Sequence, residues 1–156
     1  LFIRSYFNNI ASLLNKEDLS IWEHFFFGAY NKTHETGGFL HQSRMMLVTD
    51  FGDTLCLAPF VPSDWMKGIR PIVARNLPTR FGVVSFEIQP YENASMVEAS
   101  VQIPAGIEKS TKVGLCIPLG EIKSVTVNGQ TWSRYDAKAG LIDLTGLTGN
   151  IQVLVR

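Results

Sequence analysis

The chain has 156 residues, of which 46% are hydrophobic, enough to bury the core of one ordinary domain or of one domain with an appendage. Fourteen basic residues balance fourteen acidic residues, and the absence of a basic stripe argues against nucleic-acid binding. No apolar run approaches the ~20 residues of a membrane span, and no signal peptide is recognisable. Because the first residue is Leu1 and not methionine, we expect a processed chain or a fragment.

The first fifty residues have the pattern of two helices. An apolar stripe of three- and four-residue spacing indicates the first helix, and its members are Phe2, Tyr6, Ile10, Leu13 and Leu14. A second helix is predicted to begin near Glu35, with Thr33 as its N-cap. The pair predicts an αα-hairpin joined by a connection of roughly residues 16–33. Helix connections in bundles usually have ~2–8 residues, so this long connection is typical of a functional or partner-facing loop.

Residues 51–156 have the pattern of strands. Short segments of period two are broken by Gly, Pro or Asn, at 54–60, 68–75, 82–90, 95–104, 111–118, 122–129, 131–136, 140–144 and 150–155. Asn128-Gly129 indicates a type I′ hairpin. No helical pattern separates the strands, which excludes βαβ units and favours an antiparallel β-sandwich. The fold class is therefore mainly β, an antiparallel β-sandwich preceded by an N-terminal αα-hairpin, and the predicted core includes Val84, Phe86, Val101, Val125 and Val127.

The helical hairpin cannot bury its own apolar stripe. Leu1, Phe2 and the run Phe25-Phe26-Phe27 must pack on the sandwich or on a part of the protein that lies outside this chain. We favour the second interpretation, in which residues 1–50 are the end of a larger helical domain.

Cysteine and histidine do not form a recognisable metal motif. Cys56 and Cys116 lie in predicted strands and are interpreted as two buried apolar cysteines, with a disulfide left open. His24, His34 and His41 include no HExxH pair, and the sequence has no CxxC. The sequence therefore predicts neither a metal nor a cofactor.

Several motifs in collinear order resemble a known family. They are KTHE at 32–35 and RMMLV at 44–48, GDTLCLAP at 52–59, SDWMKG at 63–68, PTRFGVVSFEI at 78–88, IKSVTVNGQTW at 122–132 and LTGLTGNIQV at 144–153. With these motifs the chain resembles the C-terminal end of bacterial six-hairpin glycosidase-like proteins. In those proteins the last hairpin of an (α/α)6 barrel leads into a β-sandwich. At position 56 a tryptophan is usual, and Cys56 departs from that pattern.

The resemblance implies a division of the chain and a setting for it. Residues 1–50 would be the last hairpin of an (α/α)6-type barrel, and residues 51–156 would be its C-terminal sandwich. The missing N-terminal barrel of the same protein is then the expected partner, with glycan as a further ligand. A periplasmic or extracellular bacterial location is expected on the same ground.

The resemblance also implies candidate site residues. If Glu35 opens the last inner helix of a barrel, then Glu23, His24, Lys32, His34 and Glu35 would face the sugar site of the intact protein. Glu35 and His34 are the catalytic candidates, but glycoside hydrolysis needs two carboxyl groups ~5–9.5 Å apart. No complete pair is expected within this chain. The alternative is a plain helix start, in which Thr33 caps the helix and Glu35 complements its dipole.

Two function hypotheses follow. The first is a C-terminal, largely structural part of a carbohydrate-active, glycoside hydrolase-like protein, inactive as an isolated chain. The second is a stand-alone glycan- or protein-binding β-sandwich module without catalysis. The second would use exposed aromatic rings that stack on sugars, for which the candidates are Trp22, Trp65, Tyr91, Trp132 and Tyr135. Core or interface roles are the alternative for these rings.

Overall fold

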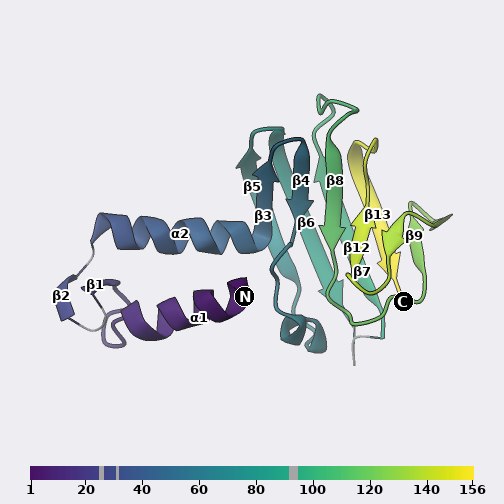
Figure 1. The fold of residues 1–156 in the computed structure, drawn as a ribbon. Helices are drawn as coiled ribbons and strands as arrows, with labels where there is room; N and C mark the ends of the chain where they lie inside the picture. The colour runs from purple at the N-terminus through teal and green to yellow at the C-terminus, as the bar shows by residue number, and fades with distance from the viewer. Residues whose placement is uncertain (25–26, 31, 92–94) are drawn as a thin grey trace. The chain divides into compact units, whose positions relative to one another are not determined.

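The structure is a computed structural model that describes residues 1–24, 27–30, 32–91 and 95–156; for residues 24 and 27–30 it describes the backbone alone. The chain divides into two compact units, Leu1–Met46 and Leu47–Arg156. The first is helical, and the second contains two β-sheets (Figure 1). The predicted fold class, a mainly β protein with a sandwich preceded by a helical hairpin, is confirmed. No helix in the described part of the chain is long and apolar enough to cross a membrane.

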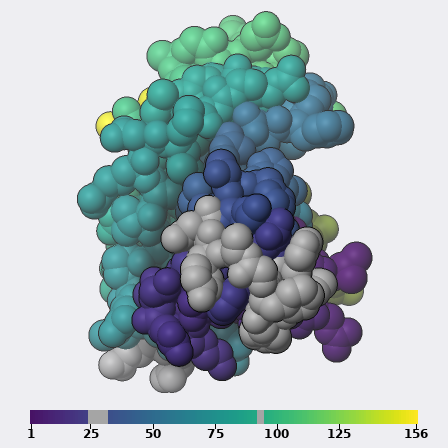
Figure 2. Space-filling model, turned by 90° about the vertical axis from the view of Figure 1, so that its left-hand side faces the viewer, coloured from purple at the N-terminus to yellow at the C-terminus, as the bar shows by residue number. Residues whose placement is uncertain are grey.

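The first unit consists of two helices and a small hairpin between them. Helix α1 spans Phe2–Leu13 and helix α2 spans Thr33–Leu47, whose last residue already belongs to the second unit. The connection, predicted as a loop, contains the antiparallel strands β1 (Trp22–His24) and β2 (Phe27–Tyr30). The space-filling view draws this unit in purple and blue (Figure 2).

Polar and aromatic contacts join α1 to α2. The ring of Tyr6 stacks on Phe39, with 6.0 Å between ring centroids, and its hydroxyl lies 3.0 Å from the Ser43 hydroxyl. One turn along, the amide of Asn9 donates to the Gln42 side-chain oxygen at 3.1 Å. The two helices therefore meet partly through hydrogen bonds, which accords with the finding that no residue of α1 is fully buried.

The predicted N-cap of α2 is wrong by one residue. The Lys32 carbonyl accepts the first helical hydrogen bond, from the Thr36 N–H at 3.0 Å, so Lys32 occupies the cap position. Thr33 is the first residue of the helix itself. Helix α2 begins one residue earlier in the chain than the polar pattern predicts.

The second unit is a sandwich of two sheets. The six-stranded sheet has the order β10-β9-β13-β7-β6-β5, and the five-stranded sheet has the order β11-β12-β8-β4-β3 (Figure 1). The strands of the first are β5 Ile72–Thr79, β6 Gly82–Pro90, β7 Val97–Ile103, β9 Val125–Val127, β10 Gln130–Trp132 and β13 Gly149–Val155. Those of the second are β3 Val48–Phe51, β4 Thr54–Leu57, β8 Lys112–Cys116, β11 Tyr135–Asp136 and β12 Leu141–Asp143. A short 3-10 helix, Ser63–Lys67, lies between β4 and β5.

One pairing in the sandwich is parallel. Strands β4 and β8 run in the same direction, with Cys56 opposite Gly114, whereas the other strand pairs that the structure describes in the sandwich are antiparallel. The chain makes this possible because it leaves the five-stranded sheet after β4, builds β5, β6 and β7 in the other sheet, and then returns as β8. A parallel pair needs such a crossover connection.

Strand β3 was not predicted. It begins directly after the last residue of α2 and pairs with β4, and the compact unit that contains both sheets begins at Leu47. The strand has four residues, and the apolar residues before it continue the helical pattern. A boundary without Gly, Pro or a polar break gives no signal in the sequence.

The core lies between the two sheets and follows the alternation of the sequence. The five predicted core residues Val84, Phe86, Val101, Val125 and Val127 have exposed fractions of 0–4%. Cys56 and Cys116 are half-buried, so the prediction that both are buried is wrong. They alternate with the fully buried leucines of β4 and β8 and therefore lie on the outer face of the five-stranded sheet.

The predicted hairpin at Asn128-Gly129 is confirmed. Both residues have positive φ angles, 50° and 78°, and the flanking residues Val127 and Gln130 pair across the turn. These are the dihedral signs of a type I′ turn. The Asn128 side chain also accepts a hydrogen bond from the Gln152 N–H at 2.8 Å, which ties the turn to β13.

Candidate functional site

The ionisable residues predicted at the start of α2 form two separate pairs. The Lys32 ammonium lies 3.3 Å from the Glu23 carboxylate, and the His34 Nε2 lies 3.4 Å from the Glu35 carboxylate. The His34 side chain is 65% exposed and that of Glu35 is 29% exposed. The side chain of His24 lies outside the described residues. The structure thus brings four of the five predicted residues into pairs, and exposed pairs of this kind typically contribute little to stability.

Glu35 also lines a small hollow within the helical unit. The hollow has a volume of about 50 Å³ and lies between α1, α2 and Ile21. Its lining includes Asn9, Phe39 and Gln42, the residues that join the helices. Pockets for small ligands usually have ~300–1,000 Å³. The hollow is too small to hold a sugar ring.

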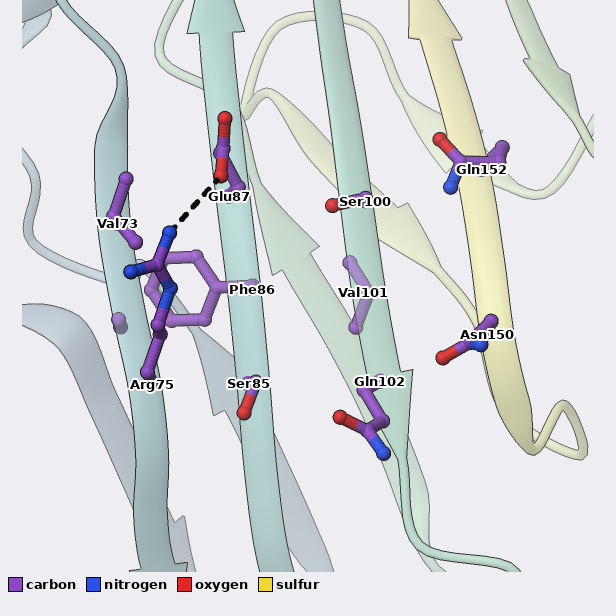
Figure 3. A pocket seen from close by; sticks show the side chains of 11 residues that line it. Val73, Arg75, Ser85, Phe86, Glu87, Ser100, Val101, Gln102, Asn150 and Gln152 are labelled. Atoms are coloured by element: carbon purple, nitrogen blue, oxygen red, sulfur yellow. Dashed lines mark ion pairs between the residues drawn. The ribbon is translucent and has the colours of Figure 1, made fainter.

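A larger depression lies on the outer face of the six-stranded sheet (Figure 3). Its volume is about 260 Å³, near the lower end of the range for small-ligand sites. Four neighbouring strands contribute outward side chains to its lining, which are Val73, Arg75, Ser85, Glu87, Ser100, Gln102, Asn150 and Gln152. Hydroxyl, amide, guanidinium and carboxylate groups therefore share one concave surface.

A bulge in the edge strand shapes one side of this depression. The register of β5 against β6 shifts between Ala74 and Leu77, so that Arg75 and Asn76 together face Ser85. Asn76 has a φ of 54°, and its N–H donates to the Ser85 hydroxyl at 3.0 Å. Bulges bend a strand and redirect its side chains. Here the guanidinium of Arg75 points toward Glu87, 4.0 Å from its carboxylate (Figure 3).

The arrangement can bind a polar ligand but offers no ring for stacking. Phe86 is the aromatic residue of the lining, and it is only 3% exposed because its side chain faces the core. The Arg75–Glu87 pair is long and its side chains are 76% and 44% exposed, so both groups can take other hydrogen-bond partners. The side-chain amides of the lining both donate and accept hydrogen bonds, and they lie near the Arg75–Glu87 ion pair, which can separate. Such a surface suits a ligand rich in hydroxyl groups.

The aromatic residues predicted to stack on glycans lie elsewhere. Tyr91 is exposed and its hydroxyl donates to Glu98 at 2.8 Å, which raises the pKa of Tyr91. Trp65 is 44% exposed within the short 3-10 helix, where its neighbour Met66 is the buried residue. Trp22 and Tyr135 are half-buried. Four of the candidates lie on separate elements, Tyr91 lies just after β6, and none of the five lines the depression.

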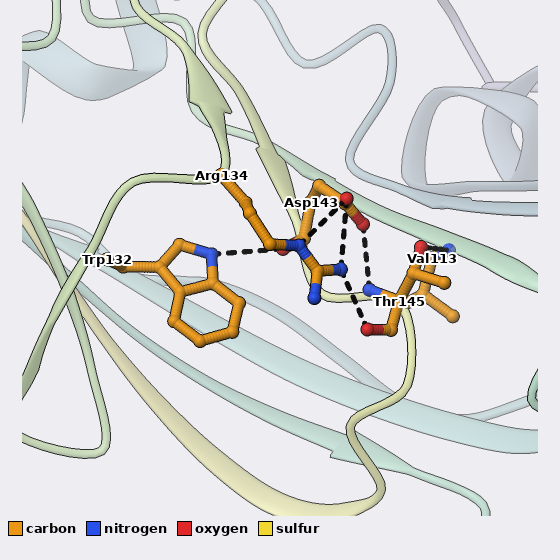
Figure 4. Close-up of polar contacts among 5 residues, drawn as sticks. All are labelled: Val113, Trp132, Arg134, Asp143 and Thr145. Carbon is orange, nitrogen blue, oxygen red and sulfur yellow. Dashed lines mark hydrogen bonds and ion pairs between the residues drawn. The ribbon is translucent and has the colours of Figure 1, made fainter.

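Trp132 belongs to a polar network at the edge of the sandwich (Figure 4). Its indole N–H donates to the Asp143 carbonyl at 3.0 Å, and the Arg134 guanidinium lies 5.1 Å from its ring centre. Arg134 pairs with the Asp143 carboxylate at 2.9 Å and donates to the Thr145 carbonyl at 2.7 Å. These contacts hold the ring in place against β12. Trp132 therefore has a structural role, as in the alternative interpretation of the aromatic residues.

The described residues include no group of three or more His, Cys, Asp or Glu side chains that could hold a metal ion. The two cysteine thiols lie close together, with 3.4 Å between Cys56 Sγ and Cys116 Sγ.

Sequence reasoning did not find the depression. Each polar residue of the lining occupies an outward position in a predicted strand, and alternation alone could have placed it on the solvent side. Alternation does not predict the strand order, which places β13 beside β7, and it does not predict the bulge at Arg75.

Comparison with solved structures finds similarity between this chain and parts of glycoside hydrolases. One is a GH127 β-L-arabinofuranosidase from Geobacillus stearothermophilus T6, with 17% identity and a TM-score of 0.38 over 78% of this chain and 18% of that chain. Another is a glycoside hydrolase with 14% identity and a TM-score of 0.40, over 92% of this chain and 24% of that chain. No protein family model matches the sequence, and no curated protein matches it.

The chain thus spans about a fifth to a quarter of the solved chains that it resembles. Identities below 20% and TM-scores near 0.4 identify neither a family nor a substrate for this chain.

Proposed function

We propose that this chain is a largely structural, non-catalytic part of a carbohydrate-active, glycoside hydrolase-like protein. In this proposal the sandwich is a supporting module, and residues 1–46 belong to a helical domain formed with further helices of the same protein. The carbohydrate part rests on the resemblance of the sequence motifs to the end of six-hairpin glycosidase-like proteins. A bacterial periplasmic or extracellular setting is proposed on that ground alone.

The observation that carries the proposal is the exposed apolar surface of the helical unit. No residue of α1 is buried, Phe7 is 46% exposed, and Leu40 of α2 is 62% exposed. An amphipathic helix gains most of its stability by covering its apolar face. A unit that covers its apolar residues only in part therefore suits a place at the edge of a larger helical assembly.

Amide hydrogen exchange tests this proposal. In the isolated chain we expect residues of α1 to exchange nearly as fast as an unstructured peptide, while strands β6, β7 and β13 are protected. In a longer protein that carries additional helices, α1 should gain protection comparable to that of the strands. Equal protection of α1 and the strands in the isolated chain would contradict the proposal, because α1 would then need no further partner.

The proposal also assigns no hydrolysis to the chain itself. Glu35 and His34 form one exposed pair, and a glycosidase needs two carboxyl groups that face one sugar. We expect no turnover of a panel of aryl glycosides by the purified chain. Reproducible turnover that is lost in Glu35→Gln would overturn this part.

In the complete protein, residues at the start of α2 are proposed to line the sugar site. Glu35→Gln or His34→Ala should then weaken glycan binding or turnover, while unfolding free energy changes by less than ~1 kcal/mol, as for exposed substitutions. A matched control is His41→Ala, which removes an exposed histidine further along the same helix. Full activity in both the Glu35 and the His34 variants would show that this stretch is only a helix start.

The depression on the six-stranded sheet supports a second candidate function, the binding of a glycan by the sandwich without catalysis. The supporting observation is that four neighbouring strands contribute polar side chains to a depression of about 260 Å³. Titration with a panel of neutral and acidic oligosaccharides, followed by NMR chemical shifts, tests it. Gln102→Ala and Gln152→Ala should abolish shifts that Gln130→Ala, an exposed change on β10 outside the depression, leaves intact. Unchanged shifts in all three variants would exclude this surface.

A further inference from the structure

The two cysteines of the chain meet on the outer face of the five-stranded sheet. Cys56 lies on β4 and Cys116 lies on β8, sixty residues later, yet their sulfur atoms are 3.4 Å apart. Both residues are half-buried free thiols. The sequence contains no other cysteine, so these two thiols have no competing partner within the chain.

The strand register places the two cysteines near each other. In the parallel register Cys56 is opposite Gly114, and Cys116 is two residues further along β8. Cys56 and Cys116 are therefore diagonal neighbours on one face of two adjacent strands. A Cβ atom at position 114 would lie 3.8 Å from the Cys56 sulfur, an ordinary contact distance, and 2.9 Å from the Leu141 side chain, which would have to move. The thiol pair therefore lies beside Gly114, whose lack of a side chain leaves room for Leu141.

The thiols are chemically unequal. A hydrogen bond from Cys116 lowers the pKa of Cys56, against the opposing effect of burial. The same hydrogen bond, together with burial and the charge of a Cys56 thiolate, raises the pKa of Cys116. The first proton is thus lost from Cys56, while Cys116 keeps its proton and donates to the thiolate. The thiolate is the nucleophile in thiol–disulfide exchange.

We propose that Cys56 and Cys116 form a redox modification site, a dithiol that low-molecular-weight disulfides convert into an intramolecular disulfide. The Cys56 thiolate attacks one sulfur of the oxidant RSSR and releases RS⁻, leaving a mixed disulfide on Cys56. Cys116 then loses its proton and attacks the Cys56 sulfur, and a second RS⁻ leaves. The two released thiolates take up the two protons, so one RSSR becomes two RSH as the protein loses two hydrogens.

The geometry favours this second step over a stable mixed adduct. The sulfur atoms need to approach by only ~1.4 Å to reach the disulfide bond length of about 2.05 Å. Once Cys56 has reacted, its sulfur is no longer a thiolate that accepts the Cys116 proton, so the hydrogen bond to Cys56, which is the largest cause of the raised pKa of Cys116, is removed together with the smaller effect of the thiolate charge. A metal ion is a poorer occupant, because the described residues offer no third His, Cys, Asp or Glu ligand beside the pair.

The bond would join the only parallel pair of strands among the described strand pairings. Between β4 and β8 the chain builds β5, β6 and β7 of the opposite sheet, so the disulfide closes a long loop that runs through both sheets. Closing a long loop restricts the unfolded chain. The cysteines lie diagonally and not directly opposite each other, so some strain is expected, and the bond should be readily reduced by excess thiol.

Incubation of the whole reduced chain with oxidised glutathione tests the proposal. We expect intact-mass spectrometry to show the loss of two hydrogens and no retained glutathione. Non-reducing peptide mapping should then yield one linked species containing Cys56 and Cys116, and the urea midpoint of the oxidised chain should rise. Excess reduced glutathione should reverse all three changes.

Single-cysteine variants provide the matched controls. Cys116→Ser should accumulate a glutathione adduct on Cys56, and Cys56→Ser should accumulate one on Cys116, because neither variant has a second thiol to displace the glutathione. Circular dichroism verifies that each variant is folded, and the wild-type mapping remains decisive if one is not. Two glutathione adducts on the wild type, or no reaction of the folded wild type when the urea-unfolded chain reacts, would overturn the proposal.

Discussion

Asp143 connects three groups at the edge of the sandwich. Its carboxylate accepts from Arg134 and from the Thr145 N–H at 2.8 Å, while its carbonyl accepts from the Trp132 indole. Partial burial raises the pKa of Asp143, but the hydrogen bonds and the charge of Arg134 outweigh burial and hold the pKa below its usual value. A single residue, through its carboxylate and its carbonyl, thereby fixes the loop after β12 against the hairpin that carries Trp132 (Figure 4).

Removing this carboxylate should destabilise the sandwich and reduce its sensitivity to acid. Asp143→Ala loses the carboxylate contacts with the Arg134 guanidinium and with the Thr145 N–H, and we expect a cost of ~1–2 kcal/mol after allowance for its solvent exposure. Because the folded pKa lies below the unfolded value of about 3.9, the contribution is present above that pH and is lost as the pH falls further. Urea unfolding at pH 7 and at pH 3 measures both effects.

The control for this prediction is Asp64→Ala. Asp64 also has a basic partner, Lys67 at 2.6 Å, but both side chains are more than 70% exposed. Its loss should change the unfolding free energy by less than ~0.5 kcal/mol at either pH. If Asp143→Ala is as mild as Asp64→Ala, the network does not contribute to the stability of the fold.

At the scale of elements, β6 offers a direct test of the alternation that organises the sandwich. Neighbouring valines at 83 and 84 point to opposite faces, with exposed fractions of 55% and 0%. Val84→Ala should cost ~1–3 kcal/mol through lost burial and a residual cavity. Val83→Ala should change stability by less than ~0.5 kcal/mol. Equal denaturation midpoints for the two variants would mean that Val84 is not packed in the core.

The β9–β10 hairpin depends on a glycine. Gly129 has a φ of 78°, and no atom lies within 4 Å of the position that a Cβ would occupy. Gly129→Ala should therefore cost ~1–2 kcal/mol through backbone strain alone, because side chains disfavour the left-handed region. Gly106→Ala is the matched control, since Gly106 also has open space around it but no positive φ. Thermal unfolding of both variants separates backbone strain from steric effects.

The sequence predicts those elements whose pattern is local. The alternation of β6 and β7, the Asn128-Gly129 turn and the stripe of α1 each depend on neighbouring residues, and each prediction agrees with the structure. The parallel pairing of β4 with β8 depends on contacts between residues far apart in the sequence. Such pairings are set by the packing of whole sheets, which a local pattern does not contain.

The same distinction applies to the candidate sites. The sequence predicts a cluster of ionisable residues near Glu35, and the structure brings four of them into two pairs. Glu23 lies in β1 and Lys32 lies shortly after β2 of the same hairpin, and His34 and Glu35 are neighbours in the first turn of α2. The depression on the six-stranded sheet and the pair of cysteines were not predicted as sites. Both require the strand order, since β13 lies beside β7 and β4 lies beside β8 only in the folded chain.

At the scale of the whole molecule, the two units differ in how completely each buries its apolar residues. Among the described residues, Ile21 and Met46 are the buried hydrophobic residues of the first unit, and all the others belong to Leu47–Arg156. Both large sheets also lie entirely within the second unit. The helical unit is held instead by the contacts of Tyr6 and Asn9 with α2.

This difference predicts that residues 47–156 fold alone. The shortened chain should unfold in one cooperative transition, with a free energy within ~1 kcal/mol of the sandwich transition of the whole chain. Leu57→Ala, which truncates a fully buried side chain of β4, should cost ~2–5 kcal/mol in both backgrounds. Urea unfolding followed by tryptophan fluorescence and circular dichroism gives both values. If the shortened chain lacks a cooperative transition, or if Leu57→Ala has a smaller effect there, then the helical unit stabilises the sandwich core, and the two units form one cooperative domain.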